Sequence, residues 1–109
     1  MKPSAHSDCF ARNNLPPAEQ WPDLLLHGFD YPDRLNAGVD LIDPLVVKGF
    51  GDHTARIGNG RRCTYKGLAD WTNRLAHALV ENLGVNPGNR VLIRSANNPA
   101  MVACWLAAT

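Results

Sequence analysis

A stripe of large apolar side chains between residues 65 and 83 is the feature that most constrains how this chain folds. Its members recur at intervals of three and four, which places them on one face of a helix: Leu68, Trp71, Leu75 and Leu79. Thr64 stands where an N-cap residue belongs, and Gly84 can take the left-handed conformation that follows the last turn of a helix. The spacing therefore predicts an amphipathic helix over residues 65–83.

Two shorter apolar segments follow this helix. Residues 90–94 come after a turn at residues 86–89 and suit a β-strand that is covered on both faces. Asn98 is a good N-cap for a second helix over residues 99–108, and the apolar side chains of that helix cover most of its circumference. It should therefore be buried on all sides. The order of helix, buried strand and buried helix predicts an α/β fold.

The second helix reaches the end of the sequence without a stop signal. After Leu106 there is no glycine, asparagine or basic residue to satisfy its last carbonyl groups. We therefore expect residues 35–109 to be the start of a larger domain that is truncated at residue 109 and is incomplete on its own.

The region before the stripe predicts a β-hairpin and one more helix. Residues 54–57 and 61–65 are β-prone segments on either side of Gly58-Asn59-Gly60, and Asn-Gly between such segments is a strong hairpin signal. Further upstream, apolar residues recur at a helical spacing: Leu35, Val39 and Ile42. Asp43-Pro44 should end that helix, because a proline inside a helix removes a backbone hydrogen bond. The same pair could also start a new helix, with Asp43 as the N-cap and Pro44 at the first helical position.

Residues 1–34 are predicted to be an extended leader. Their prolines exclude a long helix: Pro3, Pro16, Pro17, Pro22 and Pro32. Several aromatic side chains and the run Leu24-Leu25-Leu26 would gain by burial. Two arrangements fit this composition. The leader is either strapped over a larger body, or a loose terminus with one short helical turn near residues 19–26.

Composition excludes several classes of protein. The chain has 109 residues and a net charge of +1, so it holds at most one domain and has no electrostatic basis for binding nucleic acid or an anionic membrane. Its longest apolar run, residues 100–108, is too short to span a bilayer. The first residues lack the pattern of a signal peptide. The three cysteines form no metal or redox motif: Cys9, Cys63 and Cys104. Both observations favour a location in the cytoplasm.

No group of residues forms a catalytic or metal-binding pattern. The four histidines lack the spacing of metal ligands: His6, His27, His53 and His77. The glycine pairs at residues 49–51 and 58–60 do not fit a phosphate-binding loop. Ser95 follows the predicted strand, where α/β folds place ligand contacts, but a loop hydroxyl or cap is the commoner role, as it is for Asn97 and Asn98. We expect no catalytic, cofactor-binding or metal-binding residue in this chain.

Four motifs follow one another in the second half of the chain. The first two are Thr64-Tyr65-x-x-Leu68 and Asn73-Arg74-Leu75-Ala76. The next two are Gly84-Val85-x-Pro87-Gly88-Asn89-Arg90-Val91 and a helix capped by Asn98 that ends in Ala107-Ala108. This order resembles the N-terminal region of the AMP-forming acyl-CoA synthetases, the adenylate-forming superfamily. Residues 10–17 and 31–36, with Trp21-Pro22, are most similar to the 2-aminobenzoate–CoA ligases. One departure is Gly67, where the family often has an acidic residue that completes a capping box.

The resemblance implies a two-step reaction in the complete enzyme. ATP activates an aromatic carboxylate as an acyl-adenylate with release of pyrophosphate, Mg²⁺ offsets the phosphate charge, and the CoA thiol then displaces AMP. It also implies that the phosphate loop, the acid pocket and the catalytic lysine lie beyond residue 109. The segment alone would then be inactive and bind none of ATP, CoA and Mg²⁺, and its partner would be the rest of its own catalytic domain.

Two alternatives remain open. Another adenylating enzyme, such as a medium-chain acyl-CoA synthetase or a peptide-synthetase adenylation domain, shares the pattern of residues 64–108. A small non-catalytic binding module would need a partner surface over residues 100–108, because so apolar a patch is unusual on a soluble monomer. Dimerisation through this C-terminal apolar helix would cover the same patch.

Overall fold

The computed structural model describes residues 5–23, 25, 27–32, 34–58 and 60–109. The chain divides into two compact units. Unit 1 consists of Met1–Leu35 with Asn86–Arg90, and unit 2 consists of Asn36–Val85 with Val91–Thr109. Every buried side chain among the described residues belongs to unit 2.

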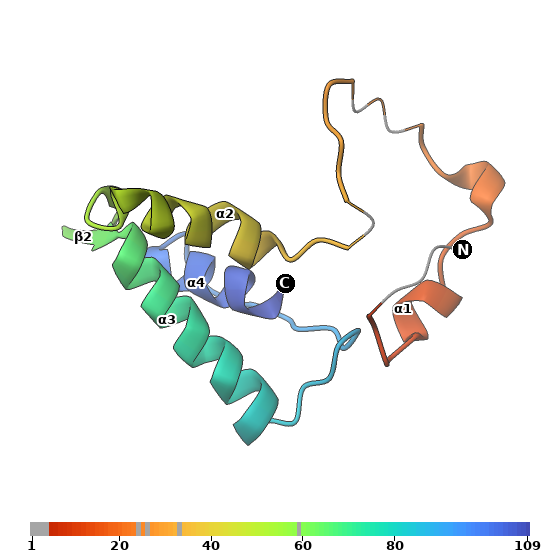
Figure 1. Ribbon diagram of the computed structural model, residues 1–109. Helices are drawn as coiled ribbons and strands as arrows, with labels where there is room; N and C mark the ends of the chain where they lie inside the picture. Colours follow the sequence, from red (N-terminus) through yellow and green to blue (C-terminus); the bar gives the residue numbers. More distant parts are fainter. Residues whose placement is uncertain (1–4, 24, 26, 33, 59) are drawn as a thin grey trace. The chain divides into compact units, whose positions relative to one another are not determined.

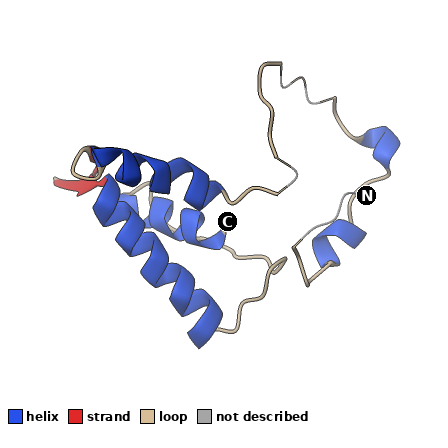
Figure 2. Cartoon of the chain, in the orientation of Figure 1, coloured by secondary structure: helices blue, strands red, loops and turns tan. Residues whose placement is uncertain are grey.

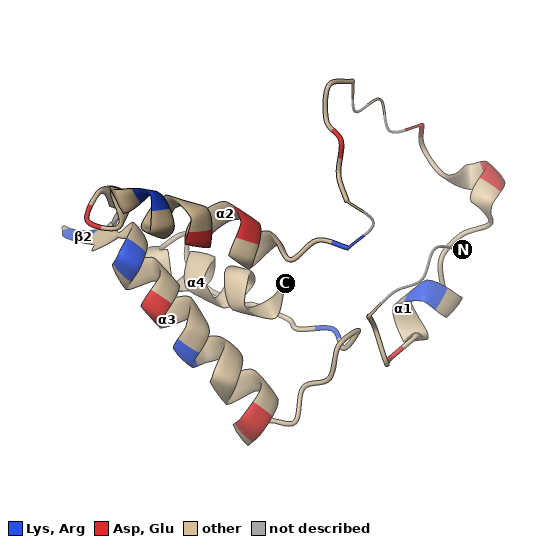
Figure 3. Cartoon of the chain, viewed as in Figure 1, with Lys and Arg blue, Asp and Glu red and all other residues tan. Residues whose placement is uncertain are grey.

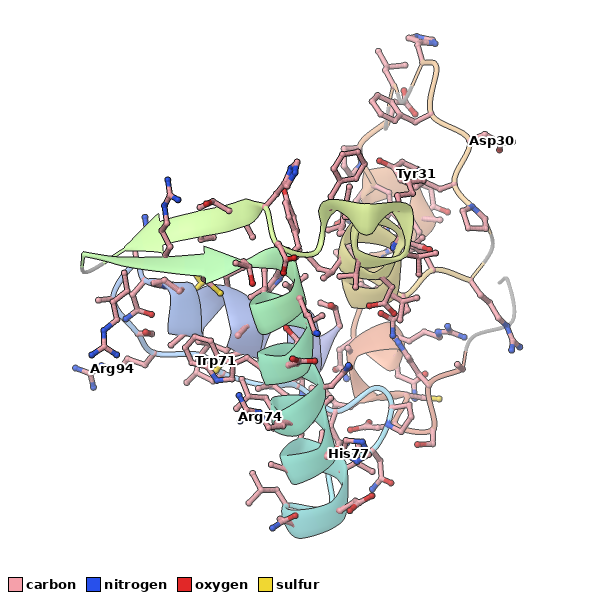
Figure 4. The ribbon with its side chains drawn as sticks, turned by 60° about the vertical axis from the view of Figure 1, so that its left-hand side comes forward. Asp30, Tyr31, Trp71, Arg74, His77 and Arg94 are labelled. Atoms are coloured by element: carbon pink, nitrogen blue, oxygen red, sulfur yellow. The ribbon has the colours of Figure 1, made fainter. Side chains whose placement is uncertain are left out.

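Unit 1 contains two short helical segments joined by irregular chain, as Figures 1 and 2 show: α1 (Phe10–Asn13) and the 3₁₀ turn η1 (Ala18–Gln20). Pro17 precedes η1, where its missing N–H costs no hydrogen bond. The predicted helical turn near residues 19–26 overlaps η1 only at its start, and Leu24 and Leu26 lie outside the described residues. Farther along, the rings of Phe29 and Tyr31 stack with centroids 5.9 Å apart (Figure 4).

Unit 2 is made of helices that pack around a small core, with a hairpin beside them (Figure 1): α2 (Ala37–Leu45), β1 (Thr54–Gly58), β2 (Arg61–Thr64), α3 (Tyr65–His77) and α4 (Pro99–Ala108). Each helix contacts the other two, and α3 packs most extensively on α4. The buried core takes one residue from α2, one from α3 and two from α4: Ile42, Leu68, Ala103 and Leu106. Apolar burial of this kind is the main force that holds helices together.

The predicted helix after Thr64 is confirmed. The Thr64 hydroxyl accepts a hydrogen bond from the Gly67 N–H at 3.1 Å, which caps the first turn of α3. Leu68 is 2% exposed, so the apolar stripe does face the core. The last turns continue as the π-helical segment η3 (Ala78–Asn82), and Gly84 ends it with a φ of +65°.

The predicted hairpin is also confirmed. Strands β1 and β2 pair antiparallel, with Gly58 opposite Arg61 at the turn. Gly60 has a φ of +71°, as a two-residue hairpin turn requires. Asn59, the other turn residue, lies outside the described residues.

The prediction of a strand covered on both faces at residues 90–94 is wrong for this chain. These residues form neither helix nor strand, and in the described part of the chain β1 and β2 pair only with each other. Leu92 is 94% exposed. A strand needs a neighbouring strand to take up its N–H and C=O groups, and none of the described residues forms a strand that pairs with residues 90–94.

Pro44 does not end the first helix of unit 2, contrary to prediction. Asn36 caps α2 by accepting a hydrogen bond from the Val39 N–H at 2.9 Å, and the helix runs through Pro44 to Leu45. Pro44 has no N–H to donate, but the helical backbone continues past it into the π-helical segment η2 (Val46–Phe50). The break comes at Gly49, whose φ of +88° lies outside the helical range.

Helix α4 is buried on one side rather than all round. Asn98 caps it as predicted, accepting a hydrogen bond from the Met101 N–H at 3.0 Å. Ala103 and Leu106 are buried against the other helices, whereas Trp105 is 47% exposed. The elements of unit 2 cover only one face of α4, so its remaining apolar surface stays open to solvent.

Gly38 allows α2 to approach α4 closely. A methyl group built at this position would lie 2.9 Å from the carbonyl oxygen of Leu106, which is shorter than real carbon contacts. We expect Gly38→Ala to lower the free energy of unfolding by about 1–3 kcal/mol, because the clash outweighs the better helix propensity of alanine. Urea unfolding followed by circular dichroism measures this. In the matched control Gly51→Ala the nearest atom is 3.5 Å away, an ordinary contact, so stability should not fall.

Candidate functional site

The polar residues that follow the predicted strand have local structural roles. The Ser95 hydroxyl donates to the neighbouring Ala96 carbonyl and is exposed. The side-chain oxygen of Asn97 accepts from the Arg56 guanidinium at 3.3 Å, which links this loop to β1. Asn98 caps α4. Each of these three side chains therefore takes part in a local hydrogen bond.

The histidines and cysteines are dispersed. No group of three or more His, Cys, Asp or Glu side chains that could hold a metal ion occurs among the described residues. The His53 ring packs edge-on against Phe50 at 5.2 Å, and the exposed His77 pairs with Glu81 at 3.3 Å one turn along the helix (Figure 4). Cys9, Cys63 and Cys104 are free thiols. Charges of both signs lie along α3 and none lies on α4 (Figure 3).

The densest polar cluster of the chain lies in unit 1, where residues 7–10 meet the turn at residues 86–90. The Pro87 carbonyl accepts three hydrogen bonds: from the Ser7 N–H at 2.8 Å, the Asp8 N–H at 3.0 Å and the Ser7 hydroxyl at 3.1 Å. The Asn89 N–H closes the predicted turn by donating to the Asn86 carbonyl at 2.9 Å. Segments 80 residues apart in sequence therefore share one hydrogen-bonded network.

Asp8 uses both of its carboxylate oxygens in this cluster. One oxygen accepts from the Phe10 N–H at 2.8 Å at the start of α1. The other accepts from the Asn89 amide at 2.8 Å and lies 3.4 Å from the Arg90 guanidinium. The same guanidinium lies over the Phe10 ring, 4.2 Å from its centroid. Residues 8 and 10 thus hold Arg90 from two sides.

These contacts favour the ionised carboxylate. The Phe10 N–H, and after it the Asn89 amide and the Arg90 guanidinium, lower the pKa of Asp8 below its ordinary value. Because the pKa in the folded chain is the lower one, the stabilisation is complete above the unfolded value of 3.8 and is lost as the pH falls through the folded value. Asp8 is therefore charged and fully engaged at neutral pH.

An apolar groove of about 440 Å³ lies in unit 2, between the end of the α3–η3 helix and the irregular segment at residues 91–95. Three of the residues that line it are not aliphatic: Arg94, Ser95 and Cys104. The other lining residues are aliphatic: Leu75, Ala78, Leu79, Leu83, Val91, Leu92 and Ile93. Leu83 is 71% exposed. An exposed surface of this kind is typical of an interface with another part of a protein.

Comparison with known proteins decides the family. Residues 45–109, more than half of the chain, match the family of AMP-binding enzymes. The chain belongs to this family. The matched region begins at the end of α2 and contains the hairpin, α3, the apolar groove and α4. The elements of unit 2 from the hairpin onward are therefore those of an AMP-binding enzyme.

Three curated AMP-binding relatives are CoA ligases for aromatic acids. The chain is 36% identical over 74 residues to 3-hydroxybenzoate–CoA ligase of Aromatoleum sp. (strain CIB). It is 36% identical over 72 residues to 3-hydroxybenzoate–CoA/4-hydroxybenzoate–CoA ligase of Thauera aromatica, and 40% identical over 62 residues to benzoate–CoA ligase of the same organism. These alignments cover 57–68% of the chain but only 12–14% of each relative. No solved structure matches the chain.

The structure adds one cluster that the sequence did not predict. Asp8 and Asn89 are 81 positions apart, and no spacing in the sequence connects the two residues. The only local signal was the turn at residues 86–89, which the sequence predicted correctly without showing which residues contact it.

No helix in the described part of this AMP-binding enzyme segment has both the length and the apolar character of a membrane span.

Proposed function

We propose that this chain is a scaffold segment of an AMP-forming aromatic acid–CoA ligase. The observation that carries the proposal is the similarity to three ligases that are all named for benzoate or a hydroxybenzoate. The match to AMP-binding enzymes agrees with it. The described residues supply packing surfaces and caps rather than a cluster of reactive groups, which fits a structural contribution to a larger catalytic domain.

In this proposal the complete enzyme works in two steps. The carboxylate of the acid attacks the α-phosphorus of ATP, so that pyrophosphate leaves and an acyl-adenylate forms, with Mg²⁺ bound to the phosphates. The thiol of CoA then attacks the acyl carbon, and AMP leaves. We propose 2-aminobenzoate or a close benzoate analogue as the acid, because the leader resembles 2-aminobenzoate–CoA ligases. The rest of the catalytic domain would cover the apolar groove and the open face of α4.

A direct assay tests whether the chain acts alone. We expect the purified 109-residue chain, incubated with ATP, Mg²⁺, CoA and either 2-aminobenzoate, benzoate or 3-hydroxybenzoate, to release no AMP above the blank. The reason is that, by its resemblance to the family, the phosphate loop, the acid pocket and the catalytic lysine would lie beyond residue 109. A full-length benzoate–CoA ligase serves as the positive control. Turnover by the chain itself would show that it is more than scaffold.

A chimera tests the positive part of the proposal. The aligned 74 residues of the Aromatoleum 3-hydroxybenzoate–CoA ligase are replaced by the corresponding residues of this chain. We expect a soluble ligase that keeps the acid preference of the recipient, because a scaffold segment supplies no acid-binding group. A soluble chimera that makes no AMP, or one whose preference moves to 2-aminobenzoate, would contradict a purely structural role. Steady-state rates with the three acids provide the measurement.

A further inference from the structure

The turn at residues 86–90 has the properties of a binding surface for the segment at residues 7–10. It presents a carbonyl at Pro87, an amide donor at Asn89 and a guanidinium at Arg90, all used by residues 7–10. At Gly88 the absence of a side chain leaves room for the backbone of the occupant: a methyl group there would collide with the Asp8 carbonyl and lie 2.9 Å from the Cβ of His6. The surface therefore fits its occupant in shape as well as in hydrogen bonding.

The contacts combine general and specific recognition. The Ser7 and Asp8 N–H groups both donate to the Pro87 carbonyl, which requires the bend that the chain makes at Ser7 but no particular side chain. The carboxylate of Asp8 and the ring of Phe10 add partners that are specific to this sequence, namely Asn89 and Arg90. Charge-assisted hydrogen bonds and cation–π contacts of this type fix register as well as adding affinity.

We propose that residues 7–13 are an N-terminal strap whose receptor is the turn at residues 86–90, and that the Asp8 carboxylate is the latch that keeps the strap docked. The occupant is the chain's own N-terminal segment. Docking fixes the backbone around two peptide bonds, the one after Arg12 in α1 and the one after Arg90, and fixed backbone is cleaved more slowly than mobile backbone. The proposal is independent of the ligase function, and either can fail without the other.

Limited trypsin digestion tests this proposal within one molecule. Arg12 and Arg90 lie in the strap and the turn, Arg34 is exposed in the same unit, and Arg74 lies within α3. In Asp8→Ala we expect cleavage after Arg12 and Arg90 to be faster than in the wild type by on the order of tenfold, because undocking frees the backbone of both segments. Cleavage after Arg34 should not change. Mass spectrometry measures the rate of cleavage at each site, and the rate at a site in the variant is compared with the rate at the same site in the wild type.

A second variant separates docking from the stability of α1. Asp8 also bonds the Phe10 N–H, so its removal loosens α1 directly. Asn89→Asp keeps a side-chain oxygen for the Asn86 N–H, but it places a carboxylate against Asp8 and leaves α1 untouched. We expect it to accelerate cleavage after Arg12 as strongly as Asp8→Ala does, with Asp23→Ala as an inert control.

Two outcomes would overturn the proposal. Unchanged cleavage after Arg12 in Asn89→Asp would show that the turn does not hold the strap. Faster cleavage after Arg74 in either variant would show that the contacts support the fold of unit 2 rather than a separate latch.

Discussion

Replacing Leu68 by alanine is expected to lower the free energy of unfolding by about 3 kcal/mol, the typical loss for a buried leucine. Leu68 is 2% exposed and belongs to the four-residue core of unit 2. The change removes most of the one buried side chain that α3 contributes to that core, and the partly buried side chains packed around it relax only in part to fill the cavity. Urea unfolding followed by circular dichroism should show a midpoint well below that of the wild type.

Leu83→Ala is the matched control for this experiment. Both leucines continue the same apolar stripe, but Leu83 is 71% exposed. Its truncation removes little buried surface, and alanine is an excellent helix former, so the midpoint should shift only slightly. If the two variants were equally destabilised, the core would not be centred on Leu68.

Gly88→Ala is expected to release the N-terminal strap. Gly88 has a φ of +96°, which costs a residue with a side chain about 1–2 kcal/mol. The added methyl group would also collide with the Asp8 carbonyl, and the simplest relief is for the strap to leave the turn. We expect trypsin cleavage after Arg12 to rise as it does in Asp8→Ala, without a change in the thermal midpoint of unit 2.

Gly28→Ala isolates the backbone part of that effect. Gly28 also has a positive φ, +85°, but a methyl group built there meets no atom within 4 Å. The two substitutions therefore impose similar backbone strain and differ in the contact with Asp8. Faster cleavage after Arg12 in both variants would point to general loosening of unit 1 instead of displacement from the turn.

Features set by near neighbours were predictable from the sequence. The caps at Thr64 and Asn98 and the turn at residues 86–89 depend on residues within a few positions, and each is present in the structure. The buried position of Leu68 followed from helical spacing in the same way. Short-range patterns carry enough information for such elements because the interacting groups are fixed by local backbone geometry.

Features that depend on distant or additional partners were not predictable in the same way. The composition of residues 90–94 is that of a buried strand, but composition cannot supply the neighbouring strand that pairing requires. The contact between Asp8 and Asn89 joins positions 81 apart and leaves no trace in spacing. The motifs predict no catalytic, cofactor-binding or metal-binding residue in this chain, and that expectation stays a prediction.

The distance between the strap and its turn also sets an order of events during synthesis. The N-terminal segment leaves the ribosome first, but its receptor lies 80 residues later in the chain. At typical translation rates that separation corresponds to about 4–16 s. Throughout that interval Phe10 has no guanidinium to cover it, and it is free to contact chaperones or other nascent chains. Docking of residues 7–13 therefore has to wait until residues 86–90 have been made.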